Sequence, residues 1–250
     1  LGGVLPRHMQ IIQMIDDDHR ASTGRPADVG IIQHDQVRMG ELAFIMAGKV
    51  NGVSALHTEL LQRTVFRDLN AVYGERIVNK TNGITFRRWL HRANPGLTRL
   101  LVDALGERVL HGDGAAALPD LARHADDAGF REAFAAQRRE RKVALARVIA
   151  ERTGVAVDPD ALFDVQVKRI HEYKRQLLNL IHTVALYQAI RNEPTTDWVP
   201  RVKIFAGKAA ASYHQAKLII KLANDISRTV NDDPTVRGLL KVVFIRSEEH

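Results

Sequence analysis

The densest group of potentially reactive charges in this sequence is a run of four basic side chains: Lys168, Arg169, Lys174 and Arg175. Only Glu172 offsets them within the run. Arginine offers a rigid fork of donors to a phosphate, while lysine offers a mobile point charge. Such a group can bind one or more phosphates. The residues alone leave a solvated basic surface turn open as the alternative.

The elements around this run predict a strand before it and a helix after it. Leu162, Phe163, Val165 and Val167 alternate with polar residues as in a strand. The apolar positions after the run have helical spacing, and they would form the packing face of a helix: Leu177, Leu178, Ile181, Val184 and Ala185. Because helix N-termini carry free N–H groups and a positive dipole end, a strand-to-helix junction favours anions.

The C-terminal part of the sequence alternates between apolar strands and amphipathic helices. We expect, in order, a strand at 162–167, a helix at 176–191, a strand at 202–210, a helix at 213–230 and a strand at 239–245. This alternation is typical of a parallel sheet with right-handed crossovers, and it places the chain in the α/β class. Anions bind at the carboxyl ends of such strands, where residues 168–174 and Gly207-Lys208 would lie.

The N-terminal part is less regular. We expect a helix from about Pro6, a loop over 16–35, a buried helix or strand over 37–47, an Asn51-Gly52 turn followed by a helix, and helical structure from 97 to 152 with interruptions at 112–114 and near Pro119. His57 falls within an amphipathic helix and is interpreted as a packing residue rather than a catalytic one. The Asn82 amide can read a sugar hydroxyl. For a lone Asn-Gly dipeptide, however, the residues favour an Asx-turn or a helix cap.

Composition limits the partners and the type of site. The 36 Lys and Arg against 29 Asp and Glu give a formal charge of +7, which favours anionic partners. Aromatic residues make up only 6%, and no aromatic-studded basic strand is present, so nucleic acid is not expected. The sequence has no cysteine, which excludes disulfides and thiolate metal sites, and we expect no metal.

No apolar run approaches the roughly eighteen residues that a membrane span requires, so we expect no membrane association and a cytoplasmic location. The sequence begins at Leu1 and ends on RSEEH directly after an apolar strand. Both ends look cut, which is expected of a fragment.

Three stretches together resemble the glycogen/maltodextrin (α-glucan) phosphorylase family. They are VNGVSALHTEL at 50–60, KTNGITFRRWLHRANPGL at 80–97 and FDVQVKRIHEYKRQLLN at 163–179, in the order and approximate spacing of that family. LPRHMQII near the start and FAGKAAASYHQAKLIIKLAN at 205–224 are also similar to family sequence. The resemblance extends to about Phe244, and KRIHEYKRQ is its most distinctive motif.

The resemblance implies a fold of two Rossmann-like halves that face a cleft, the GT-B type of glycosyltransferase, only partly present here. Residues 1–82 would be the C-terminal end of the first domain, and residues 83–250 the first part of the second, cofactor- and phosphate-binding domain. The implied reaction is phosphorolysis of terminal glucose from an α-1,4-glucan by inorganic phosphate, giving α-glucose 1-phosphate with retained configuration. The implied cofactor is pyridoxal 5′-phosphate, and the implied intact enzyme is a homodimer.

The resemblance also assigns roles to individual residues. Arg169 and Lys174 are similar to the ligands of the substrate phosphate, and Lys168 is similar to a residue near the cofactor phosphate. Tyr173 would border the same pocket. Asn82 resembles the residue that reads a glucose hydroxyl, and Val53 would line the sugar site.

The sequence departs from the family pattern in several places. Phe86 stands where the family has Pro, and Ala211-Ser212 replaces Pro-Gly. The chain diverges at about Arg246, before the lysine that forms the cofactor Schiff base, so we expect that lysine to lie outside this chain and the isolated fragment to be inactive.

Two alternative hypotheses stand beside the phosphorylase function that the resemblance implies. One is a non-catalytic basic α/β module that binds phosphate or nucleotides. The other is a nucleotide-sugar glycosyltransferase of the same fold, which KRIHEYKRQ argues against.

Overall fold

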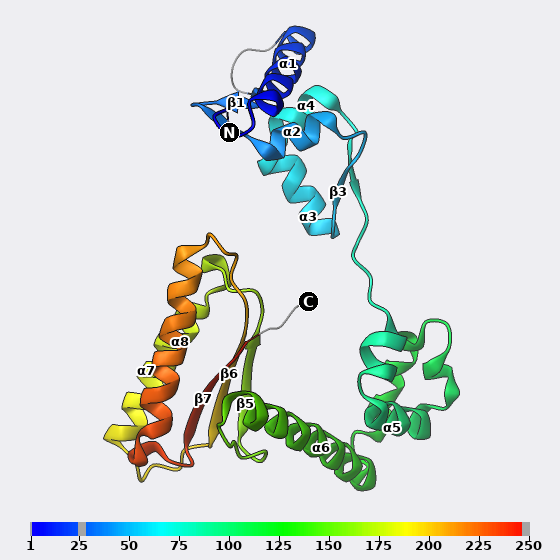
Figure 1. Ribbon diagram of the computed structural model, residues 1–250. Helices are drawn as coiled ribbons and strands as arrows, with labels where there is room; N and C mark the ends of the chain where they lie inside the picture. Colours follow the sequence, from blue (N-terminus) through cyan, green and yellow to red (C-terminus); the bar gives the residue numbers. More distant parts are fainter. Residues whose placement is uncertain (1, 25–28, 247–250) are drawn as a thin grey trace. The chain divides into compact units, whose positions relative to one another are not determined.

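The computed structural model describes residues 2–24 and 29–246. It divides into two compact units, Leu1–Thr85 (unit 1) and Phe86–His250 (unit 2), which are described separately (Figure 1). The sequence-based boundary follows Asn82. The assignment of either unit to one half of a larger fold stays a prediction.

Unit 1 combines short strands with four α-helices in its described residues. In chain order these are α1 Pro6–Thr23, β1 Ile32–Gln33, β2 Gln36–Val37, α2 Met39–Met46, β3 Val50–Gly52, α3 Ala55–Leu60, a π-helical segment Leu61–Val65, α4 Arg67–Tyr73 and β4 Ile77–Asn79. The core consists of the buried residues Val29, Phe44, Leu61, Leu69 and Ile77. The segment over 37–47, predicted to be a buried helix or strand, is mainly the helix α2, but its predicted burial is wrong, since Phe44 is its only buried residue.

Helix α1 starts at Pro6 as predicted, but the predicted loop over 16–35 is wrong for its first part, because the helix continues to Thr23. Polar residues in this part of the helix are buried and bonded rather than solvated. The carboxylate of Asp16 accepts a hydrogen bond from the Ile31 backbone N–H at 2.6 Å. His19 bonds the Val29 carbonyl oxygen at 3.1 Å. A polar sequence therefore forms a packed helix here.

The Asn51-Gly52 dipeptide is not a turn, which corrects the prediction. It belongs to β3, which pairs in parallel with β4. Gly52 is needed because α3 packs directly on the strand: a Cβ at this position would lie 2.0 Å from Thr58 Oγ1. The glycine therefore allows close helix–strand packing and does not reverse the chain.

Unit 2 carries the longer helices and strands. In chain order these are a π-helical segment Arg87–Arg92, α5 Pro95–Leu105, the 3-10 helices Glu107–Leu110 and Gly114–His124, α6 Ala128–Thr153, β5 Leu162–Val167, the 3-10 turn Glu172–Lys174, α7 Gln176–Asn192, β6 Arg201–Gly207, α8 His214–Asp232, the 3-10 turn Pro234–Val236 and β7 Leu240–Arg246. The region 97–152 is helical as predicted, although its middle is 3-10 rather than α-helical.

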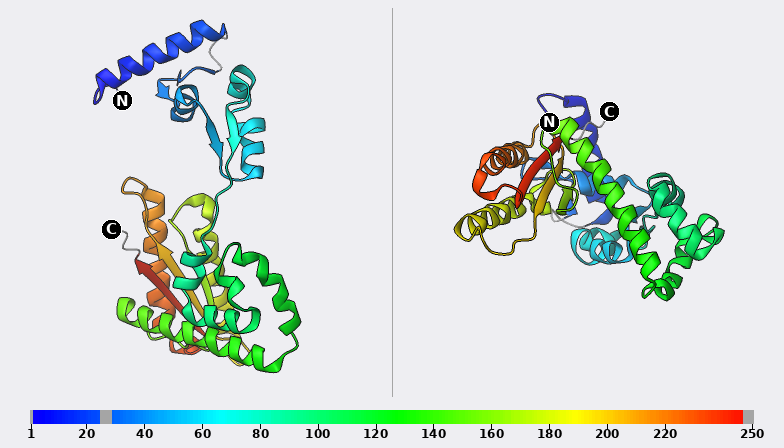
Figure 2. Two further views of the ribbon diagram at one scale, coloured as in Figure 1. Left: turned by 90° about the vertical axis from the view of Figure 1, so that its right-hand side faces the viewer. Right: turned by 90° about the horizontal axis from the view of Figure 1, so that it is seen from below.

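The three strands of unit 2 form one parallel sheet in the order β5-β6-β7, which confirms the parallel sheet predicted from sequence. Helices α7 and α8 cover one face, with Leu180, Phe205 and Ile219 in the shared core. Helix α6 covers the other face, where Ile149 packs with Val202. Figure 2 shows this three-layer arrangement, with the sheet between the α7–α8 pair and α6.

The predicted packing face of α7 is wrong. Its buried residues are Gln176, Leu180, Thr183, Tyr187 and Ile190. The apolar residues predicted to pack are instead exposed: Leu177, Leu178, Ile181, Val184 and Ala185. The helix is apolar on more than one face, and the stripe against the sheet includes polar residues. Periodicity identified the helix but selected the wrong side of it.

Candidate functional site

The basic run lies where the sequence places it, immediately after β5 and before α7. Strand β6 fixes its start, since the Lys168 N–H donates to the Ala206 carbonyl at 3.0 Å and the Ile170 N–H donates to the Lys208 carbonyl at 3.0 Å. A Cβ on Gly207 would lie 2.2 Å from the Lys168 carbonyl oxygen. This glycine lets the ends of β5 and β6 approach closely, so residues 168–174 and Gly207-Lys208 meet at one sheet edge, as predicted.

The second half of the run is a tight turn. After the 3-10 turn Glu172–Lys174, Arg175 adopts a left-handed conformation with φ 61° and ψ 31°, and α7 follows. This conformation is uncommon for a residue with a side chain, and it persists where the surroundings impose it. The turn is therefore held in place by its neighbours.

Amide side chains provide much of that support. Gln176, 1% exposed, donates from Nε2 to the Arg169 carbonyl at 3.2 Å and accepts from the His171 N–H at 3.4 Å. Gln166, on β5, donates to the Lys174 carbonyl at 3.0 Å. We call residues 168–175, held in this way, the basic turn.

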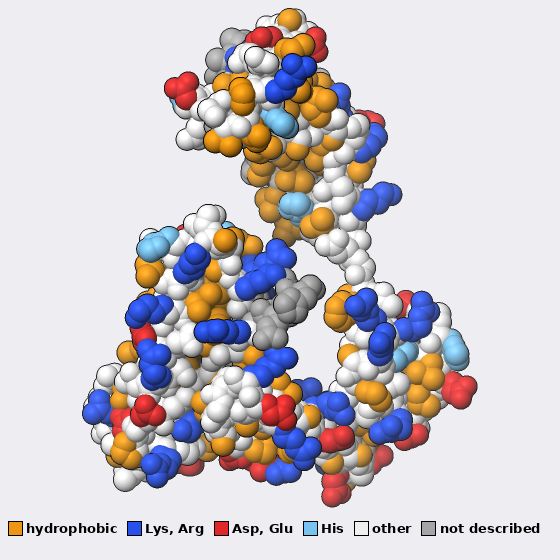
Figure 3. Space-filling model, viewed as in Figure 1, with side chains coloured by type: hydrophobic (Ala, Val, Ile, Leu, Met, Phe, Trp, Pro, Cys, Tyr) orange, Lys and Arg blue, Asp and Glu red, His pale blue; other side chains and the backbone are white. Residues whose placement is uncertain are grey.

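The cations of the basic turn reach solvent. Lys168 and Arg169 are exposed, and Lys174 is partly buried with its Nζ 5.7 Å from the centre of the Tyr173 ring. Other basic side chains are spread over the viewed face of unit 2 among hydrophobic ones (Figure 3). What distinguishes the basic turn is its fixed backbone at the carboxyl end of a parallel strand, where anions bind in α/β sheets.

An aromatic cluster borders the basic turn. The His171 ring lies 4.2 Å from the ring of Tyr173 and 5.0 Å from that of Tyr213, centre to centre. The Tyr213 hydroxyl donates to the Glu172 carboxylate at 2.5 Å and accepts from the Glu172 N–H at 3.2 Å. The hydrogen bond to Glu172 raises the pKa of the Tyr213 hydroxyl. Tyr213 thus ties the start of α8 to the basic turn.

The two residues predicted to contact a sugar lie side by side in unit 1. The Asn82 N–H donates to the Val53 carbonyl at 3.0 Å, and both side chains are exposed. The Val53 N–H in turn donates to His57 Nδ1 at 3.1 Å, which gives His57 a structural partner. The structure thus forms two groups of predicted site residues, one within each unit: Asn82 with Val53, and Lys168, Arg169, Lys174 with Tyr173.

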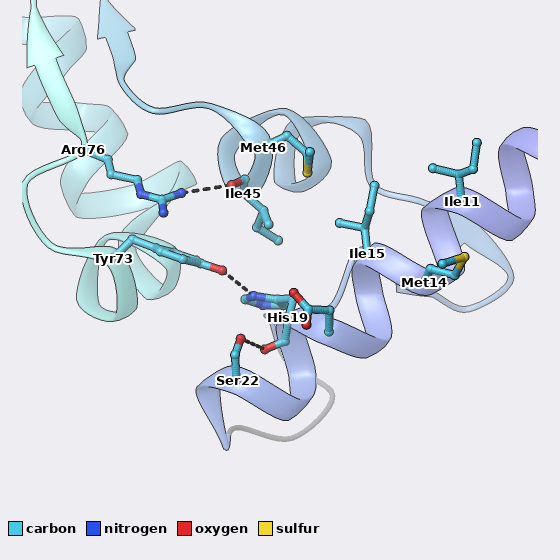
Figure 4. Close-up of a pocket in the computed structure, with 10 residues that line it drawn as sticks. Ile11, Met14, Ile15, His19, Ser22, Ile45, Met46, Tyr73 and Arg76 are labelled. Carbon is cyan, nitrogen blue, oxygen red and sulfur yellow. Dashed lines mark hydrogen bonds between the residues drawn. The ribbon is translucent and has the colours of Figure 1, made fainter.

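An open hollow of about 680 Å³ lies elsewhere in unit 1, between α1 and the C-terminal ends of α2 and α4 (Figure 4). In its wall the Tyr73 hydroxyl bonds His19 Nδ1 at 2.6 Å, and the guanidinium of Arg76 lies 4.0 Å from the centre of the Tyr73 ring. Burial raises the pKa of Tyr73. The residues that line this hollow do not include any of the predicted site residues.

The supporting amides were not identified from the sequence. Gln176 occupies a position on the buried stripe of α7, and Gln166 faces Asn179 across the β5–α7 connection. A polar residue in phase with a buried helical stripe is the signal that could have found Gln176. Its partners, which are backbone groups of the basic turn, could not be read from spacing.

Over residues 2–24 and 29–246, no cluster of His, Asp or Glu has the arrangement of a metal site. In the same residues no helix is long and apolar enough to cross a membrane. The predicted divergence after Arg246 falls mostly on residues 247–250, which lie outside the described residues.

Comparison with known families gives the basic turn its context. The family model described as carbohydrate phosphorylase matches residues 1–249. The chain belongs to the carbohydrate phosphorylase family. The resemblance seen in KRIHEYKRQ and the two other motifs therefore holds over the length of the chain.

Curated members of the carbohydrate phosphorylase family match along nearly all of this chain. Glycogen phosphorylase of Synechocystis sp. is 43% identical over 98% of the chain, and that of Pasteurella multocida is 44% identical over 97%. The muscle form of Homo sapiens glycogen phosphorylase is 38% identical over 98% of the chain. The chain spans only 30% or 31% of the length of these relatives.

Proposed function

We propose that this chain supplies the phosphate-binding part of an α-1,4-glucan phosphorylase. The whole enzyme would release terminal glucose from glycogen or maltodextrin with inorganic phosphate, as α-glucose 1-phosphate with retained configuration. The observation that carries the proposal is the basic turn, whose cations follow β5 on a backbone fixed by Gln166 and Gln176. Family membership supplies the reaction class.

The proposed roles of the cations follow from their chemistry. Arg169 would orient the substrate phosphate through its planar donor fork, and Lys174 would add a charge that stabilises the phosphate as the glycosidic bond breaks. Preformed cations are effective here because they need no rearrangement during the reaction. The amides that hold the Arg169 and Lys174 backbone would keep this arrangement ready before substrate binds.

The family implies pyridoxal 5′-phosphate, and the residues of the basic turn fit its phosphate. The donor set is cationic and reaches solvent beside the substrate-phosphate residues, as a second phosphate would need. Lys168 would hold the cofactor phosphate. When bound, the cofactor supplies a phosphate group that exchanges a proton with the substrate phosphate. Lys168, Arg169 and Lys174 would offset the repulsion between the two anions.

The sugar would be bound by the group in unit 1 that Asn82 and Val53 form. Asn82 would read a glucose hydroxyl and Val53 would line the sugar site, whereas Tyr173 would border the phosphate pocket of the basic turn. In this proposal residues 1–82 and 83–250 belong to two Rossmann-like halves that face a cleft. The homodimer of the intact enzyme stays a prediction from the family, and its cytoplasmic location stays a prediction from the sequence.

The test is Arg169→Ala in a full-length version of the protein, assayed as phosphate-dependent release of glucose 1-phosphate. We expect kcat/KM for phosphate to fall by about 10²–10³-fold, because one preorganised charged donor is lost. Arg131→Ala removes an exposed arginine near the start of α6 and serves as the charge-matched control. Turnover that is unchanged in Arg169→Ala would refute the proposed role of the basic turn.

A further inference from the structure

A buried lysine lies in the middle of the unit 2 sheet. Lys203 is on the central strand β6, between Val202 and Ile204, and its side chain is 2% exposed. Lysine is rarely buried to this degree unless its ammonium group is paired. The function proposed above does not use Lys203, so its position requires a separate explanation.

The Lys203 ammonium group has three partners for its three N–H donors. They are Asp164 Oδ2 at 2.5 Å, Asn179 Oδ1 at 3.0 Å and His182 Nδ1 at 3.2 Å. Because an ammonium group can only donate, it requires an acceptor from each partner. Asn179 must therefore present its oxygen to Lys203, and His182 must carry its proton on Nε2.

From Asn179 the hydrogen bonds continue in one direction to the basic turn. Asn179 Nδ2 donates to Gln166 Oε1 at 2.9 Å, and Gln166 Nε2 donates to the Lys174 carbonyl at 3.0 Å. Reversing either amide would place two donors or two acceptors against each other. The buried charge thus sets the orientation of both amides, and hydrogen bonds in such a chain strengthen one another.

The end of this chain is a sensitive position. The Lys174 carbonyl belongs to the peptide that leads into Arg175, whose φ of 61° is uncommon for a residue with a side chain. The first half of the basic turn has its own support from Gln176. In the second half, Tyr213 bonds Glu172, and Gln166 is the side chain that bonds the carbonyl oxygen of Lys174 itself.

We propose that Lys203 is a positioning residue for the phosphate site, acting through Asn179 and Gln166 on the backbone of Lys174. This inference rests on the proposed function, in which Lys174 contacts the substrate phosphate. Lys203 does not touch the phosphate itself. It selects one of two orientations of each amide and so holds Lys174 where its charge is needed.

The first test is Lys203→Met in a full-length version of the protein. Methionine fills a similar volume and carries no charge. We expect kcat/KM for phosphate to fall by about 10–100-fold, since small misplacements of binding groups have effects of this size. The KM for the glucan should stay within about two-fold, because the sugar residues lie elsewhere. The matched control is Lys241→Met on β7, whose Nζ donates only to the Asn231 carbonyl among the hydrogen bonds described, and it should leave both constants unchanged.

The second test asks whether the residues act in series. Gln166→Met should reproduce the phosphate effect on its own, and it carries the test if Lys203→Met does not fold. The double variant should be no worse than the more damaged single variant, because each change breaks the same chain of bonds. Additive losses would overturn the inference. A Lys203→Met enzyme would also overturn the inference if its KM for phosphate stayed at the wild-type value and only the fraction of active molecules were lower.

The outcomes separate this inference from the function it rests on. If Arg169→Ala retains normal phosphorolysis, the proposed function fails whatever Lys203→Met does. If Arg169→Ala abolishes phosphorolysis while Lys203→Met and Gln166→Met keep the wild-type dependence on phosphate, only the positioning role fails.

Discussion

Individual polar side chains in unit 2 carry specific structural roles away from the basic turn, and Asp233 is a clear case. Its carboxylate accepts from the Tyr187 hydroxyl at 2.6 Å and from the Thr235 N–H and hydroxyl at 2.8 and 2.7 Å. These bonds, the one from Tyr187 first, and nearby Arg191 lower the pKa of Asp233 from 3.8 to about 2. The charged form is therefore favoured in the folded chain.

This shift predicts a pH dependence of stability. The unfolded carboxyl binds a proton near its ordinary pKa of 3.8, whereas the folded one does so only near 2. The contribution of charged Asp233 to the stability of the folded chain is therefore complete well above pH 3.8, and it is lost as the pH falls from there to about 2. In urea unfolding, the advantage of wild type over Asp233→Asn should shrink from about pH 4 to about pH 2. Tyr187→Phe removes the hydrogen bond that lowers the pKa of Asp233 most, so it should narrow the pH range over which this stabilisation is lost. If the stability difference between wild type and Asp233→Asn did not change with pH, the lowered pKa of Asp233 would be contradicted.

At the residue scale, the charged side chains of the basic turn could be predicted from the sequence better than the amide side chains that hold its backbone. Lys168, Arg169 and Lys174 were predicted at a strand end because their charge and the flanking apolar residues are visible in the sequence. The roles of Gln166 and Asn179 could not be predicted, since an amide's partners depend on which way the folded chain turns it. Lys203 lies within a predicted strand, and nothing in the strand pattern predicts that its side chain is buried.

At the scale of elements, α7 shows what determines which side of a helix packs. Leu180 is fully buried in the core shared with β6 and α8, whereas its neighbour Ile181 is 56% exposed. Periodicity predicted α7 and its length because apolar residues recur at helical spacing. It failed on the packing face because Gln176 and Thr183 are polar yet buried, while equally apolar neighbours face outward.

This difference gives a matched pair of substitutions. Leu180→Ala should destabilise unit 2 by about 2–5 kcal/mol, because it leaves a cavity in a closed core. Ile181→Ala should change the unfolding free energy by no more than about 0.5 kcal/mol, as for other exposed positions. Chemical denaturation of both variants measures the difference. Equal effects would mean that the Ile181 face is covered in the isolated chain.

At the scale of the whole molecule, large apolar side chains remain exposed in both units. They include Ile11, Met14, Met46, Leu56, Ile84, Trp89, Val165, Val167, Leu178 and Ile181. Apolar surface of this extent is typical of interfaces with other protein segments. The parallel sheet and the place of the basic turn could be predicted because they follow from local patterns. Which protein segments cover these apolar surfaces could not be predicted, because the local sequence patterns do not identify the residues that pack against them.

We therefore predict that the isolated chain is poorly stable. Thermal unfolding followed by circular dichroism should be broad, because each unit has a small core and exposed apolar surface. Binding of a hydrophobic dye before unfolding should accompany this behaviour, and a full-length version should bind less dye per chain. A sharp, cooperative melt of the isolated chain without dye binding would contradict the prediction.

The order of the strands has a consequence for how the chain is made. Every strand pair in the described residues joins strands that follow one another in the sequence: β1 with β2, β3 with β4, β5 with β6 and β6 with β7. When the later strand of a pair leaves the ribosome, its partner has therefore already been synthesised. Such sequential pairing keeps loop closure local and lets assembly follow synthesis from the N-terminus. The basic turn would acquire the support of β6 as soon as that strand emerges, before the last strand is complete.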